Sequence, residues 1–95
     1  MSLKRKKNYI IIYQLNEPGQ KHKKLEDKLS SYSNSIKCFN TAWLVRTKKG
    51  VEEIGNELEK IIAENDDLLI LQAGKNKFTS LTDKKANRWV NKNFS

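Results

Sequence analysis

The sequence predicts an α/β fold in which two helices cover one face of a four-stranded antiparallel sheet. Apolar, β-branched runs of strand length alternate with segments whose apolar residues recur at helical spacing, and the order of these elements is β-α-β-β-α-β. The chain has 95 residues, of which 37% are hydrophobic and 32% charged, as expected for a single domain with a densely charged surface. A core of this size is small, so dimerisation would add stability.

The first half of the pattern is a strand followed by a helix. Residues 9–15 are apolar at almost every position, which predicts a central strand covered on both faces. Pro18 and Gly19 then occupy the two central positions of a predicted type II turn. From Lys21 the apolar period becomes helical, until the serine-rich segment 30–35 ends the helix.

The second half repeats this arrangement after a hairpin. Two short β runs, residues 36–39 and 42–47, predict the hairpin. An apolar stripe beginning at Val51 predicts a second helix with an acidic first turn. Gly55 within this helix is expected to allow close packing on the sheet, because glycine otherwise costs a helix about 1 kcal/mol relative to alanine. Residues 67–72 form the last strong strand.

This order is typical of the ferredoxin-like arrangement, which we expect over residues 9–74. Residues 1–8 form a basic arm before it, and residues 75–95 a tail too short to fold alone. A capping box at 80–83 predicts a short helix in this tail, which would pack on the sheet or on a second subunit. Most of the core is expected from Ile10, Ile12, Leu25, Leu29, Cys38, Leu44, Ile54, Leu58, Ile61, Leu69 and Leu71.

The net charge of +8 is concentrated in one half of the chain. Residues 1–50 carry 12 basic against 3 acidic residues, whereas residues 51–95 carry 7 against 8. A positive field in the N-terminal half favours a polyanionic partner there, although lysines that only aid solubility are the alternative. Lysines without interleaved base-reading side chains suit phosphate contacts. The residues expected to bind nucleic acid are Lys4, Arg5, Lys6, Lys7, Lys21, Lys23, Lys24, Lys28, Lys48 and Lys49.

The single cysteine, Cys38, excludes an intramolecular disulfide and favours a reducing compartment. No run approaches the ~20 apolar residues needed to cross a bilayer, and no signal-peptide cleavage site follows the first strand. We therefore expect a soluble cytoplasmic protein that does not enter a membrane.

Few residues offer catalytic chemistry. The only histidine, His22, lies on the apolar stripe of the first helix, and Cys38 lacks a histidine to activate it. Zinc ligands and a phosphate-binding glycine loop are missing. Asp66 and Asp67 are weak candidates for Mg²⁺, which commonly binds through one or two carboxylates, but a solvated turn explains them more simply.

An RNA-recognition module shares the predicted strand order. Its third strand should present aromatic side chains for stacking on bases. Tyr13 and Trp43 are the pair that would form such a platform, but aromatic residues in a small sheet more often belong to the core.

Three runs of residues resemble a known family, the CRISPR-associated Cas-two family, and most of all its stand-alone relatives. These runs are Tyr13-Gln-Leu-Asn-Glu-Pro-Gly19, Thr41-Ala-Trp-Leu-Val45 and Asn65-Asp-Asp-Leu-Leu-Ile70. The resemblance extends from Tyr9 to about Gly74. It implies a ferredoxin-like homodimer that binds nucleic acid in CRISPR or other antiviral defence and, in some members, metal-dependent endonuclease activity. In those members an Asp near the end of the first strand holds the metal; the matching position here is Gln14, whose neutral amide lacks the charge that holds a hard cation.

These observations lead to one main expectation and two alternatives. The main expectation is a homodimer that binds a nucleic-acid backbone and has a degenerate nuclease site, with no cofactor. The first alternative is an active Mg²⁺-dependent endonuclease, acting on RNA or duplex DNA, that uses Asp66, Asp67 or Glu17. The second is a scaffold that binds a larger protein partner through its acidic second helix.

Overall fold

The computed structural model describes residues 5–17, 19–74 and 84–93 of the chain. The elements are β1 (Lys7–Gln14), α1 (Gly19–Ser30), β2 (Asn34–Phe39), β3 (Ala42–Thr47), α2 (Val51–Glu59), β4 (Asp67–Ala73) and α3 (Lys84–Asn93). Their order confirms the β-α-β-β-α-β prediction. Lys4, Pro18 and the predicted capping box at 80–83 lie outside the described residues.

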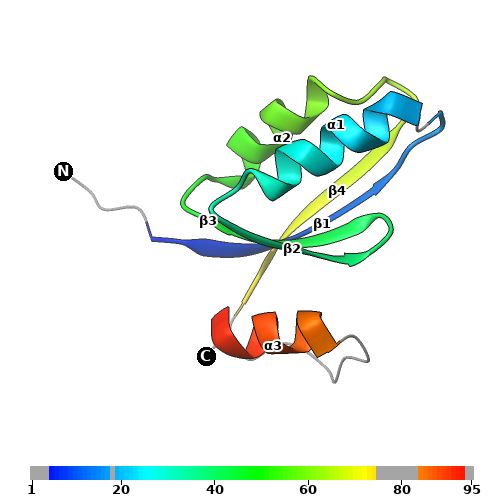
Figure 1. Ribbon diagram of the computed structural model, residues 1–95. Helices are drawn as coiled ribbons and strands as arrows, with labels where there is room; N and C mark the ends of the chain where they lie inside the picture. The colour runs from blue at the N-terminus through cyan, green and yellow to red at the C-terminus, as the bar shows by residue number, and fades with distance from the viewer. Residues whose placement is uncertain (1–4, 18, 75–83, 94–95) are drawn as a thin grey trace.

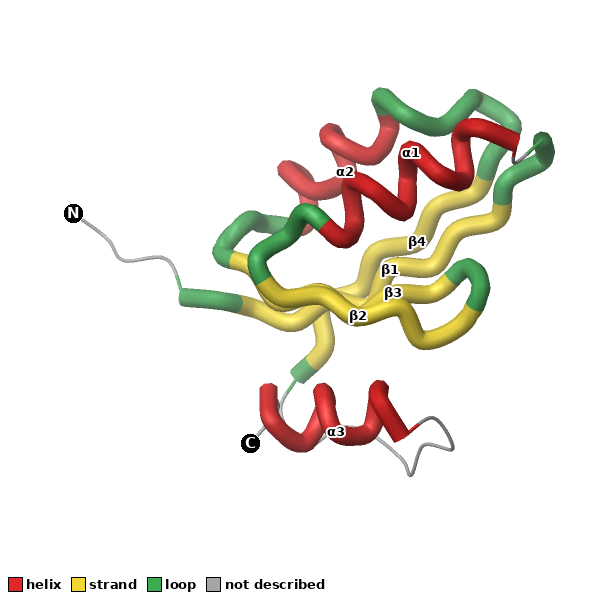
Figure 2. Tube along the Cα trace, in the orientation of Figure 1, coloured by secondary structure: helices red, strands yellow, loops and turns green. Residues whose placement is uncertain are grey.

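The four strands form one antiparallel sheet in the order β2-β3-β1-β4, which places β1 in the interior. Helices α1 and α2 lie side by side on one face of this sheet, and α3 lies on the opposite face (Figure 1). Figure 2 shows the same layers, with the sheet between the helix pair and the single C-terminal helix. The predicted ferredoxin-like α/β sandwich with a C-terminal helix is therefore confirmed.

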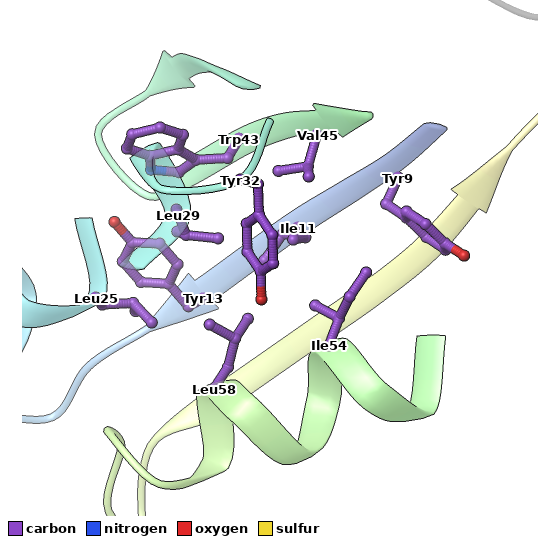
Figure 3. Close-up of a cluster of buried hydrophobic side chains, with 10 residues drawn as sticks. All are labelled: Tyr9, Ile11, Tyr13, Leu25, Leu29, Tyr32, Trp43, Val45, Ile54 and Leu58. Atoms are coloured by element: carbon purple, nitrogen blue, oxygen red, sulfur yellow. The ribbon is translucent and has the colours of Figure 1, made fainter. Parts of the chain in front are cut away.

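The main core lies between the sheet and the α1–α2 layer. Tyr9, Ile11 and Tyr13 of β1 point into it and are at most 2% exposed. The side chains from the two helices that close over them are fully buried, as the sequence predicted (Figure 3). These are Leu25, Leu29, Ile54 and Leu58.

The prediction that Ile12, Leu69 and Leu71 belong to the core was wrong. Ile12 is 41% exposed, and Leu69 and Leu71 of β4 are 49% and 51% exposed, because these side chains lie on the other face of the sheet. Side chains alternate along a strand, so a shift of one residue exchanges the faces. Since β1 is apolar at nearly every position, its sequence does not reveal the alternation. The tyrosines decide it: the hydroxyls of Tyr9 and Tyr13 donate to backbone carbonyls at the core's rim.

A second, smaller cluster holds α3 on the opposite face. Trp89 and Val90 are 9% and 3% exposed and pack with Leu44. Partly buried side chains from β1, β2 and β4 complete the cluster, namely Ile10, Ile36, Cys38 and Ala73. Helix α3, the described part of the C-terminal tail, therefore packs on the sheet of its own chain, which is one of the two positions expected for the tail.

Hydrogen bonds between polar side chains fix α3 in this position. Trp89 Nε1 donates to Asn34 Oδ1 at 2.8 Å, and Asn34 Nδ2 donates to Asn93 Oδ1 at 2.8 Å. Arg46 Nη1 donates to the carbonyl oxygen of Asn93 at 2.7 Å, and so satisfies a backbone acceptor in the last turn of α3. The helix is thus anchored by directional contacts as well as by apolar burial.

The element boundaries differ from the predictions by a few residues. β1 begins at Lys7, so the end of the predicted basic arm belongs to the sheet. α1 begins at Gly19, whose φ of +39° lies in the left-handed region that favours glycine. β2 begins at Asn34, two residues earlier than expected. α2 ends at Glu59, and the chain then continues through turns to β4.

Candidate nucleic-acid-binding surface and the end of β1

Gln14, which the resemblance aligned with a metal-binding Asp, lies at the end of β1, on the sheet face away from α1 and α2. Gln14 is exposed and lies directly opposite Asp67 in the β1–β4 register. The two residues line a shallow depression of about 320 Å³, together with Ile12, Thr41 and Leu69 among others. Among the described residues that line it, Asp67 is the only carboxylate. One carboxylate beside a neutral amide is a weak ligand set for Mg²⁺.

Asp66 and Asp67 are neighbours in the sequence, but the structure separates their side chains. Asp66 is buried on the helix side and accepts three hydrogen bonds of 2.7–2.8 Å, from Lys21 Nζ and from the backbone N–H groups of Asn16 and Ala63. The Lys21 ammonium and these backbone donors lower the pKa of Asp66 to about 2. Asp66 therefore joins the β1–α1 loop, α1 and the loop before β4, and does not form a carboxylate pair with Asp67.

The predicted basic residues fall into two groups. Lys21 pairs with Asp66, and Lys28 and Lys49 both pair with Glu57, at 3.4 Å and 2.6 Å. The second group is exposed and makes no ion pair with a described residue. It consists of Arg5, Lys6, Lys7, Lys23, Lys24 and Lys48.

Glu57 of α2 organises the paired lysines around Tyr32. The Tyr32 hydroxyl donates to Glu57 Oε1 at 2.8 Å, and both lysine ammoniums lie within 5.5 Å of the centre of the Tyr32 ring. Burial and the neighbouring carboxylate raise the pKa of Tyr32. Burial alone would raise the pKa of Glu57, but hydrogen bonds from Lys49, Tyr32 and Lys28 lower it below its ordinary value. Two of the predicted phosphate contacts thus take part in an intramolecular network.

The other residues considered for chemistry belong to the packing. Tyr13 and Trp43 are 2% and 6% exposed beneath the helices, so they cannot offer a stacking platform. His22 is partly buried and packs edge-on against Tyr13, with ring centres 5.8 Å apart. Cys38 packs in the cluster beneath α3. Within the described residues, no group of three or more His, Cys, Asp or Glu side chains is arranged to hold a metal ion.

Sequence reasoning missed the basic residues of α3. The near-zero net charge of residues 51–95 hides an acidic segment followed by a basic one. Residues 51–74 carry seven acidic residues and one basic, whereas residues 75–95 carry six basic and one acidic. A charge sum taken over each predicted element would have found this. Four of the basic residues lie in α3 and are exposed: Lys84, Lys85, Arg88 and Lys92.

Comparisons of the chain with protein-family models, curated proteins and solved structures give no significant match. None of the described helices is both long and apolar enough to cross a membrane.

Proposed function

We propose that the protein is a small homodimer that binds the backbone of nucleic acids without reading their sequence, similar in this respect to the Cas-two family. The observation that carries the proposal is the group of exposed basic side chains in the N-terminal half that no described carboxylate neutralises. Such side chains supply the salt-dependent attraction on which sequence-independent binding depends. The ferredoxin-like fold is the one that the family resemblance implies, and a role in CRISPR or other antiviral defence belongs to the same proposal.

The apolar patch on the sheet supports a homodimer. Ile12 lies opposite Leu69 in the register, Leu71 is the next residue on the same face of β4, and α3 leaves these three side chains substantially exposed. Contiguous exposed apolar side chains on a sheet favour a protein partner. A second copy of the chain would bury the patch against its equivalent and bring the two Gln14–Asp67 ends together.

The end of β1 supports binding without catalysis. Carboxylate oxygens supply the charge that holds a hard divalent cation, and the amide oxygen of Gln14 is neutral. Asp66 is already saturated by three donors. Of the three carboxylates considered for an endonuclease, only Asp67 and the exposed Glu17 would therefore remain available to a metal ion.

The test is a titration of a labelled 20-base-pair duplex at several salt concentrations. We expect the wild type to bind near physiological salt, with log affinity falling by about 0.9 per neutralised phosphate for each unit of log salt on DNA. Replacing Lys23 and Lys24 by Glu should weaken binding. These two residues are chosen because Lys21→Glu would also break the ion pair with Asp66. A loss of affinity in that variant could then come either from weaker binding or from a less stable fold. No binding near physiological salt would refute the proposal.

The acidic helix α2 favours a second candidate function, a scaffold for a larger protein. Glu52, Glu53 and Glu59 are exposed on this helix. The scaffold function is supported if the protein does not bind nucleic acid but does bind a basic protein partner, and if the variant with Glu52→Lys and Glu53→Lys no longer binds that partner.

A further inference from the structure

Helix α3 presents a stripe of positive charge to the solvent. Lys84, Arg88 and Lys92 are spaced by four residues, so they lie along one side of the helix, and all three are exposed. The stripe extends about 12 Å at 1.5 Å per residue. Residues 84–93 contain no acidic residue.

The surroundings of α3 reinforce this charge. The described residues of the apolar cluster and of the asparagine–arginine network beneath the helix include no carboxylate. Asn8 of β1 donates from Nδ2 to the carbonyl oxygen of Asn93 at 3.3 Å, so the start of β1 lies beside the C-terminal end of α3. The exposed Arg5 and Lys6 immediately precede β1. Basic residues from opposite ends of the sequence, Arg5 and Lys6 before β1 and Lys92 in the last turn of α3, are therefore carried by segments that meet at Asn8 and Asn93.

The anchoring of α3 excludes one common role of a basic amphipathic helix. Such a helix lies on a membrane by burying its apolar face among the lipids. Here the apolar residues Trp89 and Val90 are already buried against the sheet. What remains exposed is a charged surface held in a fixed orientation, which lowers the entropy cost of binding an extended polyanion.

The aromatic residues favour a duplex over a single strand. Proteins bind single strands by stacking bases on exposed aromatic rings. Within the described part of the chain, five of the six aromatic residues are at most 9% exposed, and only Phe39, at 66%, is open to solvent. The stripe of about 12 Å equals the width of the major groove of B-DNA, so its two ends could contact phosphates on both edges of the groove.

We propose that the exposed stripe of α3, together with Arg5 and Lys6, is the principal contact of this protein with the phosphate backbone of a nucleic-acid duplex. This inference rests on the proposed nucleic-acid binding and assigns it to a surface distinct from α1. On α1, Lys21 and Lys28 pair with Asp66 and Glu57, and the same helix carries Glu26 and Asp27, whereas residues 84–93 carry no acidic residue.

The test compares two double variants that change the charge equally. In the full chain, Lys84→Glu with Arg88→Glu alters α3, and Lys23→Glu with Lys24→Glu alters α1. Lys60→Glu, at an exposed position at the end of α2, is the control for a general charge effect. Binding to labelled duplex DNA, duplex RNA and single strands is followed by fluorescence anisotropy between 50 and 200 mM salt, after circular dichroism has shown that each variant is folded.

We expect the α3 variant to lose duplex affinity about tenfold or more, and the magnitude of its salt slope on duplex DNA to fall by about 1.8, as for two lost phosphate contacts. The α1 variant should lose less, and Lys60→Glu should bind within about twofold of the wild type. Should the α3 variant be misfolded, Lys84→Gln with Arg88→Gln tests the same contacts with a milder change. Duplex DNA and duplex RNA both qualify as ligand, and the relative affinity of the wild type identifies the preferred one.

An α1 variant that loses as much affinity as the α3 variant, or more, would overturn the assignment to α3 and leave the proposed function intact. A preference for single strands would also overturn it. Failure of the wild type to bind any nucleic acid near physiological salt would remove both proposals. Salt-dependent self-association that only the α3 variant abolishes, without nucleic-acid binding, would instead place α3 against the acidic α2 of a second copy.

Discussion

Lys21 and Asp66 form an ion pair of 2.8 Å that connects the first turn of α1 to the loop before β4. The Lys21 side chain is 27% exposed, whereas that of Asp66 is fully buried. The same carboxylate accepts the backbone N–H groups of Asn16 and Ala63. One side chain thereby fixes the course of both loops at this end of the sheet, next to Gln14.

The first prediction is that Asp66→Asn destabilises the fold. The amide keeps the size of the side chain but loses the charge that the three donors require. We expect the melting temperature to fall by about 5 °C or more in thermal unfolding followed by circular dichroism. Asp67→Asn, at the exposed neighbouring position, is the matched control and should change it by less than about 2 °C.

The pH dependence follows from the same contacts. The pKa of Asp66 is lowered in the folded state from 3.8 to about 2, so the folded state holds its proton less tightly than the unfolded state does. The stabilisation is therefore complete above pH 3.8 and is lost as the pH falls toward 2. Acid unfolding of the wild type should show this loss, and the difference in stability between wild type and Asp66→Asn should shrink over that interval. An unchanged difference from pH 6 to pH 2 would contradict the assignment.

The second prediction concerns Gly55 in α2. The sequence suggested that this glycine allows close packing, but a Cβ built at Gly55 would meet its nearest neighbour, Ile70 Cδ1, at 3.9 Å, an ordinary contact. Gly55→Ala should therefore stabilise the protein by about 0.5–1 kcal/mol in urea unfolding, through the better helix propensity of alanine. Gly19→Ala is the opposite case, since the φ of +39° there disfavours any side chain, and it should be destabilising.

The third prediction concerns the anchoring of α3. Arg46→Ala removes the hydrogen bond to the Asn93 carbonyl and should destabilise the docked helix by about 1–3 kcal/mol. Hydrogen exchange should then become faster in α3 while it stays slow in β1 and α2, which belong to the other core. Equal acceleration throughout the chain would show that α3 unfolds only with the whole domain.

The sequence predicted the topology well and the faces of the sheet poorly. Helical periodicity and turn residues define where the elements lie, and Leu25 and Ile54 are buried as their spacing predicted. The burial predicted for Ile12 was wrong, because β1 has no alternation of polar and apolar residues that would show which of its side chains face the helices. Which of Asp66 and Asp67 is buried depends on donors that lie far away in the sequence, at Asn16 and Lys21.

The fourth prediction tests the proposed homodimer. Leu69→Glu places a charge in the middle of the exposed apolar patch and should convert a dimer, of twice 11.1 kDa, into a monomer by light scattering. Folding should be preserved, since Leu69 is 49% exposed and contributes little to the core. Val51→Glu is the control, because Val51 is 44% exposed but lies on α2, on the other side of the sheet. A wild-type monomer at micromolar concentration would refute the dimer.

The last prediction concerns the chemistry of the Gln14 position. We expect the wild type to show little or no metal-dependent cleavage of labelled RNA or duplex DNA in Mg²⁺ or Mn²⁺. Gln14→Asp places a second carboxylate directly opposite Asp67, where cross-strand neighbours have Cβ atoms about 4.5–5.5 Å apart. Two carboxylates at this distance can share one Mg²⁺ with its remaining waters.

Gln14→Asp should therefore gain divalent-cation binding by calorimetry, while Gln14→Asn, which keeps a neutral amide, should not. The gain should also require Asp67, so the double variant with Asp67→Asn should lose it. If Gln14→Asp binds no cation, the geometry of the β1–β4 end does not suit a metal, with or without a carboxylate at position 14. If the wild type itself cleaves, and EDTA and Asp67→Asn both abolish the cleavage, the protein is an endonuclease that needs no carboxylate at the end of β1.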